Sequence, residues 1–334
     1  MLGLSNGLPY EGIVVPHPQD VQGILVGWWD FTDVDQLYQT RTSYDTAVSS
    51  DGDLIGRCKN KADTSIETSK IGTFMRANQT NDRPTYKTGG ANGHSYALFD
   101  GSTTGLACRS ESTDWGAHSA DVLATLPVIN TSLSIWIIGE PDDNDSDGAV
   151  EIALSYYGYR GTDTSYADEE QVTQFTFRRD DNEDLEARWE LASAGPTTPP
   201  VSPNIVTATQ SFSHWNNGET TIINIHTKSG VGASSIYVNG AQDVSQTLYD
   251  TTSAHNEAAK QEGIITLDNS DWDNSKNSSF GIGGRVLNTG IISSSNMFEG
   301  KIYEILIYSV TTPSTSDIAS LNSYFAQKYN ITLQ

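Results

Sequence analysis

Cysteine is scarce in this chain, which has only Cys58 and Cys108 among its 334 residues. Two thiols are too few for a disulfide framework, and we expect them to be free, buried and inert. Basic residues are also few, because 19 Lys and Arg stand against 42 Asp and Glu, for a net charge of −23. Such a surface repels phosphate groups, which argues against nucleic-acid binding and against docking on anionic lipid.

Long apolar runs and familiar catalytic motifs are missing as well. No apolar stretch approaches the length of a membrane span, and the opening residues MLGLSNGLPYEGI lack the charged and apolar regions of a signal peptide. The six histidines show no metal-ligand spacing, and G-x-S-x-G, P-loop and C-x-x-C motifs do not occur. We therefore expect a protein without an organic cofactor, and calcium is the one ion that the sequence leaves open.

The clearest structural signal lies near the C-terminus. Residues 302–308 are apolar on both alternating faces, with Ile302, Leu306 and Tyr308 expected on one face and the intervening apolar residues on the other. A strand that is apolar on both faces belongs inside a layered structure. Ser314 and Asp317 then form a capping-box-like helix start. A helical stripe follows at three- and four-residue steps, formed by Ile318, Leu321, Phe325 and Tyr329.

Most of the remaining chain predicts β-strands. Residues 32–95 are polar and show little periodicity, so we expect a long decorated connection there. Asp100-Gly101 is a favourable turn pair between two strands over 96–108. Further strands are expected over residues 24–31, 132–139, 173–177, 187–191, 222–225, 235–240 and 280–284.

Several of these segments resemble, in order, those of the laminin-G-like and concanavalin A-like sandwich domains. They are ILVGWWDF, YALFDGSTTGL, LSIWIIG, IYVNG, FGIGG and the terminal FEGKIYEILIY with its helix. The resemblance implies an all-β jelly-roll of two antiparallel sheets with one C-terminal helix. We expect this sandwich to cover residues 24–334 with long loop insertions. Residues 1–23, which are punctuated by Gly and Pro, read as an extended N-terminal arm.

Carboxylates were the first candidates for chemistry, because some enzymes of this fold place E-x-D-x-x-E on one strand. The chain lacks that order, and the nearest group is Asp181, Glu183 and Glu186 around a hairpin tip. Glu304 on the terminal strand reads as a structural carboxylate with a backbone or basic partner. The sequence therefore favours a non-enzymatic protein, with a glycoside hydrolase or lyase as the third alternative.

The sharpest ionic pattern is the loop Asp143-Asn-Asp145-Ser-Asp147-Gly148. It fits D-x-D-x-D-G, which turns three carboxylates toward one Ca²⁺ and uses the glycine for a sharp turn. An EF-hand loop needs Glu at position twelve, where this chain has Leu154, although Glu151 at position nine substitutes in part. A solvated acidic loop is the alternative reading of the same residues.

Carbohydrate binding would use exposed aromatic rings beside polar side chains. Three tryptophans stand in polar contexts, and Trp272 is flanked by two carboxylates. The predicted glycan-binding residues are therefore Trp115, Trp215, Trp272, Asp271 and Asp273.

Two functions from different classes remain. MLGLSNGL resembles the N-terminus of many tailed-phage virion structural proteins. With the sandwich, this predicts a virion protein, such as a head decoration, spike or fibre component. Its arm would contact other virion proteins or a second copy in a homo-oligomer. The alternative is a lectin or adhesion module that binds a host surface glycan.

Overall fold

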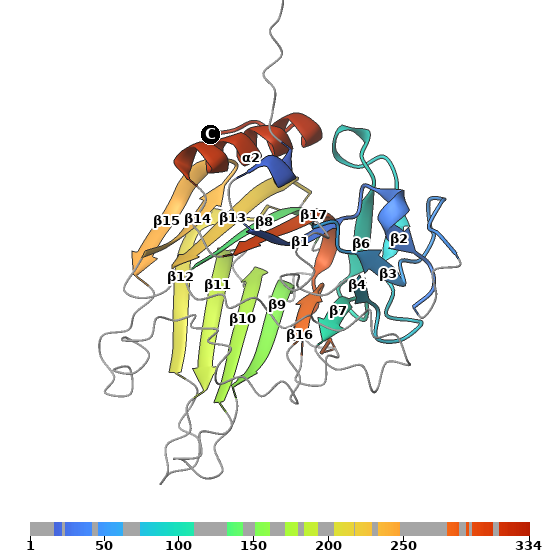
Figure 1. The fold of residues 1–334 in the computed structure, drawn as a ribbon, viewed down its shortest axis with the longest axis horizontal. Helices are drawn as coiled ribbons and strands as arrows, with labels where there is room; N and C mark the ends of the chain where they lie inside the picture. Colours follow the sequence, from blue (N-terminus) through green and yellow to red (C-terminus); the bar gives the residue numbers. More distant parts are fainter. Residues whose placement is uncertain are drawn as a thin grey trace, which may run out of the picture.

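The computed structural model describes residues 17–21, 24–41, 46–62, 74–109, 132–142, 151–160, 171–179, 184–192, 204–216, 218–228, 233–247, 279–286, 292–293, 296–309 and 314–334. These residues form two antiparallel sheets packed face to face, with one α-helix near the C-terminus (Figure 1). The expected all-β jelly-roll sandwich with a C-terminal helix is confirmed. No helix in these ranges is both long and apolar enough to cross a membrane.

The first sheet, called sheet A, has the order β15-β14-β13-β8-β17-β6-β5, and β1 also pairs with β17. Its strands are β1 (Ile24–Asp30), β5 (Thr85–Lys87), β6 (Tyr96–Asp100), β8 (Ser132–Pro141), β13 (Thr221–Lys228), β14 (Ala233–Val238), β15 (Ala241–Thr247) and β17 (Glu299–Ser309).

The second sheet, called sheet B, has the order β12-β11-β10-β9-β16-β7-β4-β3-β2. Its strands are β2 (Leu37–Tyr38), β3 (Arg57–Lys59), β4 (Phe74–Arg76), β7 (Leu106–Arg109), β9 (Glu151–Arg160), β10 (Gln171–Arg179), β11 (Asp184–Ala192), β12 (Asn204–His214) and β16 (Ser279–Ile282).

Sheet A is apolar on both faces, and this makes it the middle layer of the molecule. Its inner face joins sheet B in the main core, while its outer face forms a second core beneath α2 (Thr315–Tyr329). Trp28 lies in the outer core and Trp29 in the inner core, as expected for neighbours on one strand. Figure 1 shows α2 lying across the strands of sheet A.

β17 is buried on both faces as predicted, but the predicted division of its side chains is wrong at one end. The pairing of β17 with β8 shifts between Ile302 and Glu304. This bulge places Ile302 in the inner core, whereas Tyr303 lies in the outer core beside Leu306 and Tyr308. One extra residue in a strand reverses the alternation from that point onward. The bulge therefore puts Tyr303 and Glu304 on the same outer side of sheet A.

The region 32–95 is more structured than the sequence indicated. Its described parts supply β2, β3 and β4 to sheet B and β5 to sheet A. These strands have only two or three residues each, which is too short for a period-two pattern to show.

The segment 96–108 also differs from a simple hairpin. β6 belongs to sheet A and β7 to sheet B, so the Asp100-Gly101 turn carries the chain from one sheet to the other. The Asp100 carboxylate accepts hydrogen bonds from the backbone N–H groups of Ser102, Thr103 and Thr104. These donors favour the ionised form and hold the pKa of Asp100 far below its usual value, even though desolvation opposes this.

Helix α2 begins as the sequence predicts. The Ser314 side chain accepts from the Asp317 N–H, and the Asp317 carboxylate accepts from the Ser314 N–H. Asn330 ends the helix in the left-handed conformation. Leu321, Phe325 and Tyr329 are buried on the outer face of sheet A.

Only the end of the predicted arm lies within the described residues. Residues 17–21, called the N-terminal turn, include the 3-10 helix Pro18–Asp20. Tyr308 donates a 2.7 Å hydrogen bond from its hydroxyl to the Pro18 carbonyl, and Val21 is buried in the outer core. This part of the arm is therefore a turn seated on sheet A and not an extended segment.

Candidate functional site

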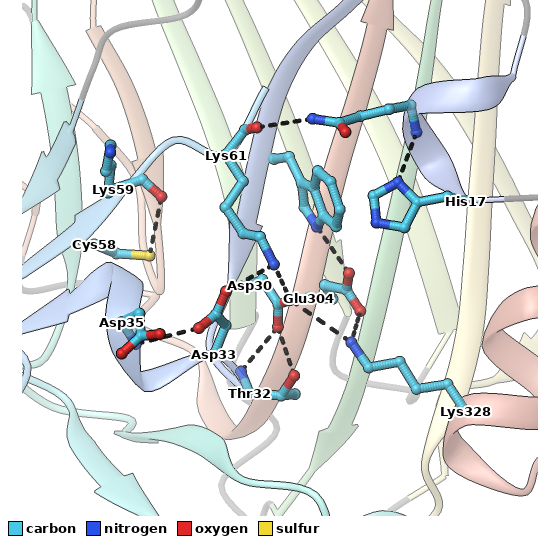
Figure 2. Close-up of polar contacts among 12 residues, drawn as sticks. His17, Asp30, Thr32, Asp33, Asp35, Cys58, Lys59, Lys61, Glu304 and Lys328 are labelled. Atoms are coloured by element: carbon cyan, nitrogen blue, oxygen red, sulfur yellow. Dashed lines mark hydrogen bonds and ion pairs between the residues drawn. The ribbon is translucent and has the colours of Figure 1, made fainter. Parts of the chain in front are cut away.

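Glu304 is the centre of a polar cluster on the outer face of sheet A. Its side chain is fully buried and accepts three hydrogen bonds. Nε1 of Trp28 donates to Oε1, while Nζ of Lys328 and the hydroxyl of Tyr329 donate to Oε2, each over 2.7 Å. The carboxylate therefore connects β1, β17 and α2, and Figure 2 shows Lys328 reaching it from the helix.

A second carboxylate stands beside it, because Asp30 on β1 is the cross-strand partner of Glu304. Lys61 places its Nζ 2.8 Å from Asp30 and 2.9 Å from Asp33. Figure 2 shows the Lys61 side chain pointing toward both carboxylates. Lys328 lies 3.7 Å from Asp30 as well as 2.7 Å from Glu304. Two lysines thus form ion pairs with three carboxylates in a part-buried network.

The two neighbouring carboxyl groups differ in their acidity. Burial raises the pKa of Glu304, the charge of Asp30 adds to the rise, and Lys328 opposes it. Burial also pushes the pKa of Asp30 upward, but Lys328 and Lys61 outweigh this and hold it below its usual value. Carboxyl pairs of this kind occur in catalytic sites, but they also occur in structural ion networks.

Two properties distinguish a catalytic carboxyl pair from a structural one: the exposure of the carboxylates and the hydrogen bonds that they already make. Asp30 is 3% exposed and Glu304 is 0% exposed, and both oxygens of Glu304 accept hydrogen bonds from protein groups. A substrate cannot reach either carboxylate without displacing α2 or its side chains. The basic partner predicted for Glu304 is confirmed as Lys328. The cluster works as a clamp that holds α2 on sheet A.

Next to the helix, a more open part of the same face carries a second polar group. Lys301 on β17 forms an ion pair with Oε1 of Glu140 on β8. Thr220 donates to Oε2 of Glu140 over 2.7 Å, and the Lys301 ammonium lies 5.5 Å from the ring centre of Tyr96. Desolvation lowers the pKa of Lys301, but its hydrogen bond to Glu140 outweighs this and raises the pKa overall.

These side chains bring polar, charged and aromatic groups together on a partly exposed part of the face. Lys301, Thr220 and Tyr96 are partly exposed, and the Glu140 side chain is 11% exposed. They offer a carboxylate, an ammonium group, a hydroxyl and the edge of an aromatic ring within one small area. Sequence reasoning missed this group because its members come from four separate segments that only the sheet brings together.

Trp215 is the one predicted glycan-binding residue that the structure describes, and the prediction is wrong for it. Its side chain is 0% exposed, stacks on Phe298 at 5.2 Å and points its indole N–H toward the Gly139 carbonyl at 3.4 Å. A ring enclosed in the inner core cannot stack on a sugar. The other four residues lie outside the described ranges and stay predictions: Trp115, Trp272, Asp271 and Asp273.

Only one of the predicted calcium ligands, Glu151, lies within the described residues. Asp143, Asp145 and Asp147 lie outside the described residues. Glu151 begins β9 and is buried, and its Oε2 lies 3.5 Å from a guanidinium nitrogen of Arg179. In the described ranges, no group of three or more His, Cys, Asp or Glu side chains could hold a metal ion. Within the described residues Glu151 is the partner of an arginine, and calcium binding by the acidic loop stays a prediction.

The acidic hairpin at the start of β11 is likewise incomplete. β10 and β11 pair as predicted, from Val172 opposite Ala192 to Arg179 opposite Leu185. Asp181 and Glu183 lie outside the described residues, and only the backbone of Glu186 is described.

A buried serine–histidine pair also escaped the sequence analysis. Ser134 on β8 and His226 on β13 are cross-strand partners, with 2.6 Å between the hydroxyl oxygen and Nδ1. Such a pair could activate a nucleophile. However, Ser134 is 1% and His226 4% exposed, and the imidazole packs edge-on against Trp136 and Tyr237. Their spacing of 92 positions left no local motif to find.

Comparisons with known proteins return only distant solved structures. No family model and no curated protein matches the chain. Solved structures that match include domain 4 of AbnA, an extracellular arabinanase from Geobacillus stearothermophilus, in complex with arabinotriose. It shares 13% identity over 90% of this chain and 98% of that chain, at a TM-score of 0.39.

Two further matches are comparably distant. The CBM40 of the Ruminococcus gnavus IT-sialidase, bound to alpha2,6 sialyllactose, shares 13% identity over 57% of this chain and 82% of that chain, with a TM-score of 0.33. The binding domain of botulinum neurotoxin serotype G shares 10% identity over 76% of this chain and 49% of that chain, with a TM-score of 0.38. At these values the matches assign no function to this chain, and a proposal has to rest on its own side chains.

Proposed function

We propose that this chain is a non-catalytic, carbohydrate-binding module of the laminin-G-like, lectin-like kind that its motifs resemble. The observation that carries the proposal is the open polar group of Tyr96, Lys301, Glu140 and Thr220 beside the helix on sheet A. Sugar rings bind through stacking on aromatic or apolar side chains and through paired hydrogen bonds to charged and hydroxyl groups.

The carboxylates of the described outer face support binding over catalysis. Glycosidic cleavage needs one carboxyl group as acid and a second as base or nucleophile, both facing the scissile bond. Glu304 is enclosed by three donors, and Glu140 is held on both oxygens by Lys301 and Thr220. Neither group has the freedom that an acid or a nucleophile requires.

A glycan array probed with the purified full chain, with Ca²⁺ and with a chelator, tests this function. We expect selective binding to at least one saccharide class and no release of reducing ends from any bound polysaccharide. The comparison with chelator also tests the calcium loop at Asp143, Asp145 and Asp147. An array with no bound glycan under either condition contradicts the proposal, and sugar release from a bound polysaccharide contradicts its non-catalytic part.

A virion structural protein is the second candidate, and one observation favours it. The N-terminal turn is fastened to sheet A through the Tyr308–Pro18 hydrogen bond and the edge-on contact of His17 with Trp28, whose ring centres are 5.0 Å apart. An arm that binds a neighbouring subunit through residues 1–16 needs a firm attachment to its own domain, and the N-terminal turn provides it. In this setting the sandwich would be displayed on a phage virion, and other virion proteins or a second copy would be the arm's partners.

Light scattering after size exclusion tests that second candidate. The full chain is compared with a variant that lacks residues 1–16 and keeps the N-terminal turn. Assembly of the full chain alone supports the role of the arm in oligomers. Identical monomeric masses contradict an arm that joins copies of this chain.

A further inference from the structure

The open part of sheet A is organised as a single row of side chains across neighbouring strands. Thr85 pairs with Leu98, Leu98 with Lys301, and Lys301 with Glu140. Thr220 continues the row through its 2.7 Å hydrogen bond to Glu140. We call these five residues the cross-strand row, and they follow one line through β5, β6, β17, β8 and the start of β13.

The direction of these side chains follows from their buried neighbours. On β6, Ala97 and Phe99 lie in the inner core, so Leu98 between them faces outward. Tyr86 and Ile302 also lie in the inner core, which turns the adjacent Thr85 and Lys301 outward. Four members of the row are partly exposed and Glu140 is nearly buried.

The rows on either side define where a ligand could lie. Toward α2, Tyr303 is fully buried, and its hydroxyl accepts from the Ala91 N–H over 3.0 Å. That neighbouring row is therefore closed by the segment around the 3-10 helix Ala91–Gly93. Tyr96 stands at the boundary, 5.5 Å from Tyr303 between ring centres, and stays partly exposed. Four side chains of the cross-strand row, by contrast, are partly exposed.

The chemistry of the row suits the two kinds of surface on a sugar ring. Leu98 and the edge of Tyr96 offer apolar contact to ring C–H groups. Thr85, Thr220 and Lys301 offer donors, and the hydroxyls and the Glu140 carboxylate offer acceptors, for ring hydroxyl groups. Because the carboxylate and ammonium already pair with each other, they are held in position before a ligand arrives.

Charge around the row selects among saccharides. The Lys301 charge is matched by Glu140. Glu299 and Asp100 are a cross-strand pair two positions from Lys301 and Leu98, Glu219 precedes Thr220, and all three are partly or fully exposed. The whole chain carries a net charge of −23. An anionic sugar would meet repulsion at long and short range, whereas a neutral sugar would not.

The length of the row indicates a chain of sugars and not a single ring. Adjacent strands lie about 4.8 Å apart, so four strand spacings from Thr85 to Thr220 cover roughly 19 Å. On the basis of the proposed carbohydrate function, we propose that the cross-strand row is the binding subsite for a linear, uncharged oligosaccharide. The saccharide lies across the strands, stacked on Leu98 and hydrogen-bonded through Thr220, Lys301 and Glu140.

Titration calorimetry on the full chain tests the row. The probes are neutral linear hexose and pentose oligosaccharides of two to six units, and acidic oligosaccharides that carry uronic or sialic acid. Leu98→Ala and Thr220→Val remove an apolar contact and a hydroxyl from the row. Leu333→Ala and Thr332→Val make the same changes at exposed positions near the C-terminus. Near-ultraviolet circular dichroism checks that every variant is folded.

The row predicts that neutral oligosaccharides bind and that affinity rises with length over the first several units. Each row variant should bind roughly three- to tenfold more weakly, as the loss of one hydrogen bond or a few apolar contacts implies. The two C-terminal controls should bind like the unmodified chain. Unchanged binding in both folded row variants overturns the row but leaves the carbohydrate function standing. Tighter binding of acidic sugars overturns the uncharged ligand, and no binding of any sugar overturns row and function together.

Discussion

Nε1 of Trp28 donates a 2.7 Å hydrogen bond to Oε1 of Glu304, joining residues that are 276 positions apart. The bond connects the first strand of sheet A to the last one, and Lys328 and Tyr329 join the helix to the same carboxylate. Buried polar groups of this kind are costly when one partner is lost and help to fix a single arrangement when all are present. The position of α2 on sheet A therefore depends on this carboxylate.

Replacing Glu304 by Ala should destabilise the fold by about 3–5 kcal/mol, because it leaves a buried lysine, indole and tyrosine hydroxyl without their acceptor. Glu304→Gln keeps one oxygen acceptor and should lose less. Urea unfolding measures both, with Gln327→Ala on the exposed side of α2 as the matched control, expected within about 0.5 kcal/mol of the parent. Equal stability of Glu304→Ala and the control would show that the clamp does not hold the helix.

Alanine substitutions at two glycines with positive φ can distinguish the cost of backbone strain from the cost of steric overlap. Gly89 has φ +74° and open space around the position of a Cβ, whereas Gly283 has φ +87° and a Cβ there would lie 2.4 Å from the Phe99 ring. Gly89→Ala should destabilise the protein by about 1 kcal/mol, from the left-handed backbone alone. Gly283→Ala should cost at least about 2 kcal/mol more, because Phe99 fills the inner core. Thermal unfolding of the pair checks the order, and a Gly283 variant as stable as the Gly89 variant would contradict the packing.

The N-terminal turn should loosen in mild acid. Burial lowers the pKa of His17, Asp20 opposes the shift, and Lys61 and Lys328 reinforce it. His17 Nδ1 also accepts from the Gln19 N–H, which a protonated ring cannot do. The docked turn favours the neutral form of the His17 imidazole. Its contribution to docking is complete at pH values above the ordinary pKa of 6.5, and it is lost as the pH falls through the lowered pKa.

A proton NMR titration of the His17 ring measures this directly. We expect a midpoint below 6.5, and a shift toward the ordinary value when Tyr308→Phe removes the hydrogen bond to Pro18 and weakens docking. Gln327→Ala, at an exposed position of α2, serves as the control and should leave the midpoint unchanged. A midpoint at or above 6.5 in the parent protein is the contrary result.

Cys58 should be inert in the folded protein. It is 0% exposed in the inner core, and burial, with Asp30 adding to the effect, raises the pKa of its thiol well above the ordinary value. Iodoacetamide at pH 8 should label Cys58 only after unfolding in urea, as followed by peptide mass spectrometry that scores Cys108 separately. Labelling of Cys58 under native conditions would show that β3 opens readily.

The main strands and the helix could be predicted from the sequence wherever apolar residues recur along a long segment with the period of a strand or a helix. β1, β8, β17 and α2 were all predictable, because each buries side chains on faces that alternation or helical spacing defines. The bulge after Ile302 was not, since it depends on how β17 pairs with β8 and leaves the local pattern unchanged.

The candidate sites were harder to predict, for different physical reasons. Trp215 has polar neighbours in sequence, yet its ring enters the core beside Gly139, where a Cβ would lie 2.8 Å from the indole. The space for the indole exists because residue 139, 76 positions away, is a glycine, and nothing in the local sequence SHWNNG indicates this. The cross-strand row was invisible for a similar reason, because its members are isolated threonines, a leucine and one ion pair until the strand register aligns them.

Backbone amide NMR during titration with the tightest-binding neutral oligosaccharide from the array shows which residues the sugar contacts. We expect saturable shifts concentrated at five residues, with smaller ones at Tyr96: Thr85, Leu98, Lys301, Glu140 and Thr220. Saturable shifts confined to other parts of the molecule would contradict the row as the binding surface, and no shifts with any glycan would contradict carbohydrate binding itself.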